Sequence, residues 1–209
     1  MYIKFKRLID FILAVILMII FSIPMLIVAI CIKLEDRGPI IYKSKRMGKN
    51  LKEFYVYKFR SMKTEREELK SSLSHEEMVT KVGKFIRKTS LDELPQLFNI
   101  IKGEMSFIGP RPWIPEYYVW FTDEQKRRTK VLPGISGLAQ VKGRNGINIF
   151  KKIEYDLEYV DNISLLMDIK CIWLTIITVF KKDNAEISEQ GIKEEIKELK
   201  EQKKYKRAI

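Results

Sequence analysis

Two adjacent acids, Asp92 and Glu93, follow two bases, Arg87 and Lys88, in the segment RKTSLDELPQLFNIIKGEMSFIGPRP (87–112). An ionised carboxylate beside a bound phosphate can attack phosphorus and form an acyl phosphate, which divides one displacement into two. Adjacent carboxylates also suit Mg²⁺, which prefers oxygen ligands and neutralises diphosphate charge. Asp92 and Glu93 are therefore candidate catalytic and metal-binding residues for phosphoryl transfer.

The same acids also fit a structural role at the start of a helix. Ser90 and Glu93 have the spacing of a capping box. With a cap at Ser90, however, Pro95 would interrupt an intrahelical hydrogen bond, whereas a cap at Asp92 puts Pro95 in the first turn, where its missing N–H costs nothing. The pattern predicts a helix over residues 94–101 with Asp92 as its N-cap. On local grounds, capping and chemistry both stay open for Asp92.

The surrounding residues favour chemistry. Bases just upstream and the N-terminus of a helix form an anion site, so a carboxylate there is expected to stay ionised. Arg111 lies between Pro110 and Pro112, and this stiff turn could present a guanidinium to a phosphate. A lone P-R-P turn is as often a loop brace. Acids, bases and turn together outline a phosphoryl-transfer site.

Hydrophobic and turn patterns predict the elements that carry these residues. Alternating aromatic and β-branched residues predict a strand over residues 54–62, and the polar stretch 65–88 is expected to be helical in pieces. Turn signals between residues 103 and 148 predict loops over a scaffold. Residues 164–180 predict an apolar helix, either in the core or in the membrane interface. Residues 188–207 predict a charged, solvated or membrane-surface helix.

The N-terminus carries an uncharged run of 22 residues, 11–32, which exceeds the roughly 20 that span a bilayer as a helix. It is longer than the hydrophobic part of a signal peptide and no small-residue cleavage site follows it. Pro24 has no N–H for the carbonyl of Ile20 and so predicts a kink, at which the Ser22 hydroxyl could satisfy freed backbone. We expect a membrane helix that bends halfway.

Basic residues flank this run on both sides. Because Lys and Arg favour the cytoplasmic side, a helix that enters and leaves by the same face is favoured over one that spans. Prolines also occur in spanning helices, so the second alternative stays open. The flanking bases are Lys4, Lys6 and Arg7 before the run and Lys33, Arg37, Lys43, Lys45 and Arg46 after it.

The composition limits the class of protein. A length of 209 residues suits one compact domain with an appendage. Thirty-nine Lys and Arg against 27 Asp and Glu predict an anionic partner, such as nucleic acid, phospholipid or a phosphorylated substrate. Cys31 and Cys171 lie in apolar runs without metal-ligand spacing and predict no disulfide, in keeping with a reducing cytoplasm. The single histidine, His75, lies in a polar stretch and argues against a histidine triad or a zinc site.

The order of four motifs behind the kinked helix resembles the bacterial sugar transferases called monotopic phosphoglycosyl transferases. The resemblance covers nearly all of residues 1–182, and the long central motif is highly specific. The length of the chain is similar to that of the small PglC-type members. The motifs are KFRSM (58–62), the segment 87–112, LPGISGLAQVKGRN (132–145) and YVDNISLLMDIK (159–170).

The resemblance implies transfer of a phospho-sugar from a UDP-sugar to polyprenol (undecaprenyl) phosphate, with release of UMP, as the first membrane step of glycan biosynthesis. It makes Asp92 the nucleophile that forms a covalent aspartyl-phosphosugar intermediate. Glu93 would act through Mg²⁺ or by activating the acceptor phosphate. It also implies that Lys58, Arg111 and Asp168 bind substrate.

Two further bases, Arg87 and Arg144, match positions for which anion binding alone is implied. One departure concerns the kink: family members commonly have Ser directly before Pro, whereas Ile23 separates Ser22 from Pro24 here. The kink is kept, but the hydrogen bonds to the backbone carbonyls at the kink have to differ.

Residues and resemblance together predict an α+β, mainly helical fold with a small cytoplasmic catalytic domain on the bacterial inner membrane. We expect a re-entrant helix in residues 1–36, the catalytic domain in 37–182 and a charged tail in 183–209. The expected partners are a UDP-sugar, polyprenol phosphate and membrane lipid, with no nucleic acid; a homodimer through the late apolar helix is a further possibility.

Two other functions remain as alternatives. One is a membrane-attached hydrolase that uses the same acyl-phosphate chemistry with water as acceptor. The other is a non-enzymatic anchor whose basic surface binds anionic lipid or nucleic acid, which leaves the adjacent acids and the P-R-P turn without a shared purpose. The sequence does not identify the sugar.

Overall fold

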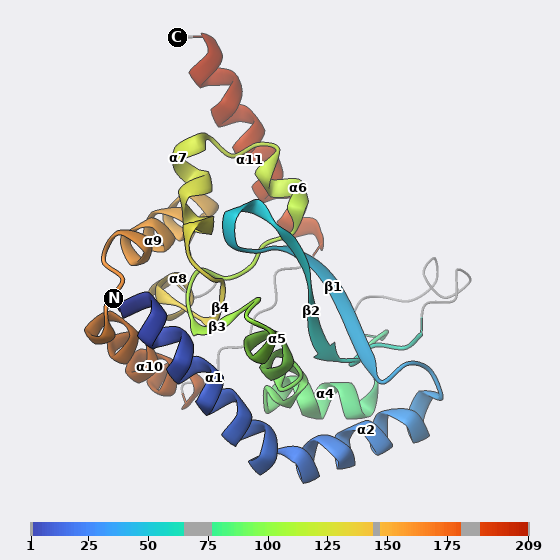
Figure 1. Cartoon of the computed structure of the whole chain (residues 1–209). Helices are drawn as coiled ribbons and strands as arrows, with labels where there is room; N and C mark the ends of the chain where they lie inside the picture. Colours follow the sequence, from blue (N-terminus) through green and yellow to red (C-terminus); the bar gives the residue numbers. More distant parts are fainter. Residues whose placement is uncertain (1, 65–76, 144–146, 181–188, 209) are drawn as a thin grey trace. The chain divides into compact units, whose positions relative to one another are not determined.

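A computed structural model describes residues 2–64, 77–143, 147–180 and 189–208. His75 and Arg144 lie outside these residues. The fold is α+β and mainly helical, as predicted (Figure 1). The chain forms two compact units: a central unit of Phe11–Ser44 and Tyr55–Lys102, and a C-terminal unit of Met1–Asp10, Lys45–Phe54 and Gly103–Ile209.

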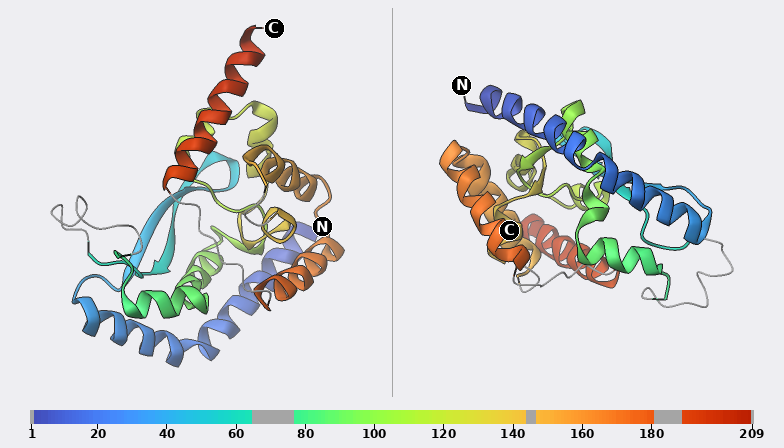
Figure 2. Two further views of the ribbon diagram at one scale, coloured as in Figure 1. Left: turned by 180° about the vertical axis from the view of Figure 1, so that it is seen from behind. Right: turned by 90° about the horizontal axis from the view of Figure 1, so that it is seen from below.

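The N-terminal hydrophobic run forms two helices, α1 (Tyr2–Ile20) and α2 (Ser22–Asp36), bent by 61° (Figures 1 and 2). The predicted kink is therefore confirmed. The Ser22 hydroxyl donates a 2.7 Å hydrogen bond to the carbonyl of Ile19, one residue before the carbonyl that Pro24 leaves without its partner. A serine two positions before the proline thus still donates a hydrogen bond to a backbone carbonyl at the bend.

Within the described residues, no single helix is both long enough and apolar enough to cross a membrane, but α1 and α2 meet that test of length and composition as a bent pair. More than half of the exposed large hydrophobic side chains of the described chain lie on these two helices. They are Ile3, Phe5, Leu8, Phe11, Ile12, Leu13, Ile16, Ile19, Ile20, Ile23, Leu26, Ile27, Ile30 and Leu34.

The other side of α2 packs against further elements of the central unit, to which α2 itself belongs. A hairpin of β1 (Ile41–Met47) and β2 (Glu53–Phe59) accounts for the predicted strand, and it is followed by α4 (Lys81–Lys88), a 3₁₀ turn η2 (Leu91–Glu93) and α5 (Gln96–Lys102). Burial of apolar area joins α2, β2 and α4 through one cluster. Its buried members are Val28, Ile32, Phe59 and Ile86.

The turn-rich segment of the C-terminal unit is more regular than the loops predicted for it. Strands β3 (Ser106–Ile108) and β4 (Gly134–Ser136) pair in parallel. The predicted turn glycines allow this pairing, because a Cβ at Gly134 would overlap the backbone nitrogen of Gly109. The Gly134 N–H donates to the Pro110 carbonyl at 3.0 Å, so the P-R-P turn begins directly beside the sheet.

Helices fill the rest of the C-terminal unit. They are α6 (Pro115–Tyr118), α7 (Asp123–Lys126), a 3₁₀ turn η3 (Arg127–Lys130), α8 (Leu138–Gly143), α9 (Ile149–Asp161), α10 (Leu165–Phe180) and α11 (Glu189–Ala208). The late apolar segment is indeed a helix, α10, which buries Cys171 and exposes Leu166 and Trp173. Both cysteines of the chain are free, as predicted.

The charged C-terminal segment is a helix, as expected, but it is not a solvated tail. Leu199 of α11 is fully buried in a cluster with Tyr117 and Phe121 of the C-terminal unit. Glu195 accepts a hydrogen bond from the Tyr117 hydroxyl at 2.5 Å and pairs with Lys152 at 2.6 Å. The spacing of a few apolar residues between many charges hid this packed face.

Candidate active site

Asp92 and Glu93 lie in the short turn that joins two helices, not at the start of a helix. The 3₁₀ turn Leu91–Glu93 contains both acids, and α5 begins only at Gln96. The prediction of Asp92 as the N-cap of a helix starting at residue 94 is therefore wrong. The capping box is absent as well, because Ser90 makes no side-chain capping bond.

The backbone of Ser90 explains this difference. Ser90 adopts φ 57°, the left-handed region, and so reverses the chain immediately after α4. Its carbonyl accepts a 3.2 Å hydrogen bond from the N–H of Glu93, which closes the turn around the two acids. A non-glycine residue in this region is strained, and such strain is common where a site over-determines the backbone.

Lys58 of β2 joins the two acids. Its Nζ lies 2.7 Å from Glu93 Oε1 and 4.0 Å from Asp92 Oδ2. Only 8% of the Asp92 side chain is exposed, against 24% for Glu93 and 23% for Lys58. The Lys58 ammonium therefore faces both carboxylates in a partly buried place, where its charge acts more strongly than in water.

Asn99 of α5 holds the strand that carries Lys58. Its Nδ2 donates to the Tyr55 carbonyl at 2.7 Å and its Oδ1 accepts from the Tyr57 N–H at 3.1 Å. The fully buried amide thus replaces a neighbouring strand along this edge of β2. Sequence reasoning missed Asn99, although an asparagine inside a helix is unfavourable unless its side chain has a partner.

Arg87 lies in the last turn of α4 and reaches the end of β2. Its Nε donates a 2.8 Å hydrogen bond to the Ser61 hydroxyl. Gly83 lets α4 approach this closely, because a Cβ there would overlap the Ser61 carbonyl. Arg87, Lys58, Asp92 and Glu93 all belong to the central unit, where Lys58 contacts both acids.

Arg111 belongs to the C-terminal unit, where its side chain is exposed. The buried guanidinium of Arg128 holds the P-R-P turn by donating a 2.7 Å hydrogen bond to the Arg111 carbonyl. Arg128 also pairs with buried Asp156 at 2.6 Å and stacks at 4.1 Å over the ring of Trp113. Sequence reasoning missed these contacts of Arg128, since the residues involved lie on different elements.

Asp168 is a buried hub of the C-terminal unit. It accepts hydrogen bonds from Lys6 Nζ at 2.6 Å, from the Tyr159 hydroxyl at 2.6 Å and from the Tyr2 hydroxyl. Burial and the Asp168 carboxylate raise the pKa of Tyr159 well above its usual range, so this hydroxyl stays protonated and keeps donating. Asp168 thereby fastens the start of α1 to α9 and α10.

The two acids offer a metal ion only part of its ligands. Among the described residues, no three or more His, Cys, Asp or Glu side chains are placed to hold a metal together. Mg²⁺ in phosphoryl-transfer sites commonly binds one or two carboxylates and takes its other ligands from phosphate and water. The two carboxylates of Asp92 and Glu93 match the number that the protein contributes to such a site.

Comparison with known proteins decides the family. The family described as "Bacterial sugar transferase" matches residues 1–182. The chain belongs to this family. The resemblance seen in the motifs is thereby confirmed, and this sugar transferase is an enzyme, as predicted.

Several curated relatives are similar to this sugar transferase. It is 43% identical over 171 residues to "Uncharacterized sugar transferase EpsL" of Bacillus subtilis (strain 168), covering 82% of this chain and 85% of that protein. It is 41% identical over 191 residues to "UDP-glucose:undecaprenyl-phosphate glucose-1-phosphate transferase" of Klebsiella pneumoniae, covering 87% of this chain and 41% of that protein. It is also 41% identical over 186 residues to "UDP-N-acetylgalactosamine-undecaprenyl-phosphate N-acetylgalactosaminephosphotransferase" of Aeromonas hydrophila. There the match covers 85% of this chain and 44% of that protein, so the chain spans less than half of these two larger relatives.

Proposed function

We propose that this chain moves a phospho-sugar from a UDP-sugar to polyprenol phosphate, releases UMP and so begins glycan assembly on a lipid carrier. The observation that carries the proposal is the contact of Lys58 with the Asp92–Glu93 pair, at 4.0 and 2.7 Å. A lone helix cap needs no such cation. The names of several relatives specify the same class of donor and acceptor, with glucose in one and N-acetylgalactosamine in another.

In the first half-reaction, a carboxylate oxygen of Asp92 attacks the sugar-bearing phosphorus of the donor. A bond forms between this oxygen and phosphorus while the bond from phosphorus to the bridging oxygen breaks, and UMP leaves with that electron pair. The Lys58 ammonium lowers the repulsion between a carboxylate and an incoming diphosphate. Lys58 Nζ lies 2.7 Å from Glu93 Oε1 and 4.0 Å from Asp92 Oδ2, so the same ammonium is close to both acids.

In the second half-reaction, a phosphate oxygen of polyprenol phosphate attacks the same phosphorus. The bond to Asp92 breaks, the carboxylate is regenerated and a polyprenyl-diphosphate sugar is formed. Glu93 assists this step either by activating the acceptor phosphate or through a bound metal. Asp92 and Glu93 would hold Mg²⁺, which would neutralise charge on the diphosphate.

Three further bases are proposed to bind phosphate, each on the strength of its own motif. Arg87 lies at the end of α4 in the central unit, and Arg111 is presented by the braced turn of the C-terminal unit. Arg144 is assigned the same role on its motif alone. For Asp168 we propose an indirect contribution, through the hydrogen bonds that tie Lys6 and Tyr159 together.

We infer that α1 and α2 form a re-entrant anchor in the bacterial inner membrane, with both ends on the cytoplasmic face. The 61° bend, the exposed apolar side chains and the bases at both ends support this topology. The acceptor's phosphate would then lie at headgroup depth while its isoprenoid tail stays in lipid. Accessibility of cysteines placed at Lys4 and Lys43, in a Cys31→Ser background, tests it: labelling of both from the cytoplasmic side supports re-entry, and labelling from opposite sides excludes it.

The activity is tested by UMP release from the purified full chain in nanodiscs with Mg²⁺, using a panel of UDP-sugars with and without undecaprenyl phosphate. We expect acceptor-dependent release from one sugar, lost in Asp92→Asn and strongly reduced in Glu93→Gln. Asp123→Asn is the matched control, since its side chain is fully exposed in a surface ion pair. Release that ignores the acceptor would instead indicate a hydrolase, and full activity in Asp92→Asn would return Asp92 to a structural role.

Trapping separates the covalent route from a direct transfer. Incubation with donor in the absence of acceptor should add the mass of a phospho-sugar to the peptide that contains Asp92. The adduct should disappear when undecaprenyl phosphate is added. An active enzyme that never carries the adduct would contradict the aspartyl intermediate.

A further inference from the structure

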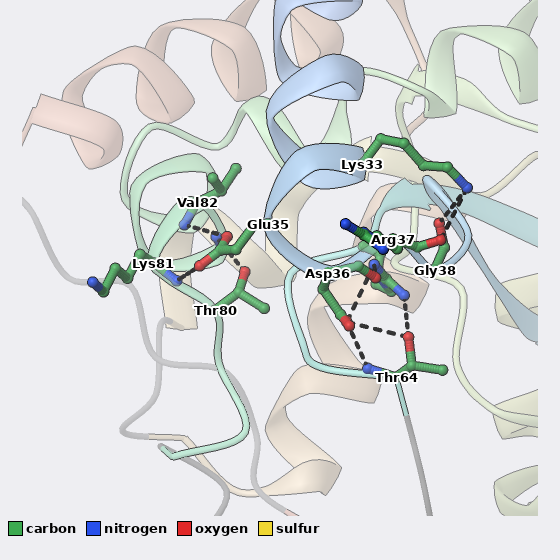
Figure 3. A network of polar contacts seen from close by, with 11 residues as sticks. Lys33, Glu35, Asp36, Arg37, Gly38, Thr64, Thr80, Lys81 and Val82 are labelled. Atoms are coloured by element: carbon green, nitrogen blue, oxygen red, sulfur yellow. Dashed lines mark hydrogen bonds and ion pairs between the residues drawn. The ribbon is translucent and has the colours of Figure 1, made fainter.

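Helix α2 ends in two acids, Glu35 and Asp36, and both bind backbone far away in the sequence (Figure 3). Glu35 Oε1 accepts from the Lys81 N–H at 2.7 Å, and Glu35 Oε2 accepts from the Val82 N–H at 3.0 Å. These are the first two N–H groups of α4. The end of one helix therefore caps the start of another within the central unit.

A local cap alone would leave these groups without a partner. Thr80, the N-cap of α4, accepts from the Gly83 N–H at 2.9 Å and so satisfies the third group only. The Glu35 carboxylate supplies two acceptors at once, and its negative charge is favoured at the positive end of the helix dipole. Thr80 and Glu35 together satisfy the whole first turn of α4.

Asp36 makes a comparable contact with the chain that follows β2. Its Oδ2 accepts from the Thr64 N–H at 2.8 Å and lies 3.3 Å from Nη2 of Arg60. The same Nη2 donates to the Asp36 carbonyl at 3.1 Å, and the Arg60 side chain is only 8% exposed. Arg60 follows Lys58 by two residues, so this contact fixes the end of the strand that presents Lys58.

We propose that Glu35 and Asp36 are positioning residues, through which the end of the N-terminal apolar helix pair sets the active-site segments of the central unit. Glu35 acts on α4 and so on Arg87, whereas Asp36 acts on the end of β2 and so on Lys58. The inference rests on the proposed function for its readout. Glu35 and Asp36 would contact neither substrate, but they hold the segments that carry Arg87 and Lys58, the proposed binding groups.

These contacts are not what keeps the central unit folded. The apolar cluster of Val28, Ile32, Phe59 and Ile86 already joins α2 to β2 and α4. Glu35 is exposed, and Asp36 is half-buried. Because a hydrogen bond has a direction that apolar contact lacks, the two acids fix how α4 and the strand end are oriented rather than whether they pack.

The test uses Glu35→Gln and Asp36→Asn in the full chain in nanodiscs. Glutamine keeps the size of Glu35 but offers one acceptor oxygen, so one N–H of α4 loses its partner. We expect hydrogen exchange of the α4 segment to rise by about 5-fold, the effect of one lost cap. Glu154→Gln is the control, since its carboxylate forms an exposed surface pair with Lys151.

Kinetics separate positioning from general damage. The amount of trapped phospho-sugar gives the concentration of active sites, so that kcat can be expressed per active site. We expect Glu35→Gln to raise the donor KM by about 5-fold with kcat nearly unchanged, because Arg87 binds an anion. Asp36→Asn should lower per-site kcat by about 10-fold with KM nearly unchanged, because Lys58 faces the reacting acids.

The experiments distinguish failure of the positioning role from failure of the proposed function. A wild-type protein without acceptor-dependent transfer would overturn the proposed function, and the positioning role with it, in the first assay. An active wild type whose two variants keep wild-type per-site kcat and KM would overturn the positioning role alone. Faster exchange of α4 without a kinetic change would show that the Glu35 contact is only a structural cap.

Discussion

The Lys58 ammonium lies 2.7 Å from Glu93 Oε1 and 4.0 Å from Asp92 Oδ2, although Lys58 precedes Glu93 by 35 residues. A strand presents the base and a tight turn presents the acids. The fully buried amide of Asn99 fastens that strand to the helix that follows the turn. The geometry of the acids therefore depends on a contact between elements rather than on the dipeptide alone.

Removing the cation should impair chemistry more than stability. We expect Lys58→Met to lower kcat by about 10²-fold or more, the size of effect seen when one electrostatic donor of an active site is deleted. Lys58→Arg should recover part of the loss, because it restores the charge but not the position of a single ammonium. Steady-state UMP release measures both, and unchanged kcat in Lys58→Met would contradict the assignment.

The backbone of Ser90 predicts an unusual tolerance for glycine. Since Ser90 has φ 57°, Ser90→Gly should leave the unfolding temperature unchanged or raise it. Ser90→Val should cost about 1–2 kcal/mol or more, because a β-branched residue is poorly tolerated there. Thermal unfolding in detergent is the measurement. Thr89→Val is a suitable neighbour control, since Thr89 has φ −98°.

The buried pair of Arg128 and Asp156 beside the P-R-P turn predicts strong and non-additive effects of substitution on the free energy of unfolding. Arg128→Met leaves the Asp156 carboxylate buried without its counter-ion, and breaking such a pair costs about 3–5 kcal/mol. Arg128→Met with Asp156→Leu should be more stable than Arg128→Met alone. A double-mutant cycle on unfolding temperatures checks this, and simple additivity of the two changes would contradict a coupled pair.

The packed face of α11 predicts that the C-terminal helix supports the fold. Leu199→Ala should lower stability by about 2–5 kcal/mol, as expected for truncating a fully buried leucine. Glu198→Ala, one residue earlier on the exposed side, should change stability by less than about 0.5 kcal/mol. Equal effects of the two substitutions would show that α11 is solvated after all.

The reactivity of the Cys171 thiol should report its burial in α10. Burial and the nearby Asp168 carboxylate raise the pKa of the Cys171 thiol to about 11. The folded state thus favours the protonated thiol; this contribution to stability is complete below the unfolded pKa and is lost as pH rises toward the folded value. In a Cys31→Ser background, maleimide should label native protein slowly at neutral pH and denatured protein rapidly. Equal rates would contradict the buried thiol.

Several features followed from local sequence. The uncharged run of residues 11–32 determined an apolar helix, and Pro24 determined its bend, because a missing N–H acts wherever the chain goes. Alternation determined the strand that carries Lys58. The adjacent acids and the motif order determined the family, since residue types in a fixed order survive without reference to distance.

Other features depended on tertiary structure. Glu35 lies 46 residues before the N–H that it caps, and Arg128 lies 17 residues after the carbonyl that it holds. The N-cap at Asp92 was a sound local prediction, but Ser90 turned the chain into the left-handed region and displaced the start of the helix to Gln96. Sequence patterns determined which chemical groups this protein has and which segments are helix or strand. The tertiary structure alone decided which of those groups meet, because a hydrogen bond or ion pair depends on distance and direction between elements that sequence spacing does not encode.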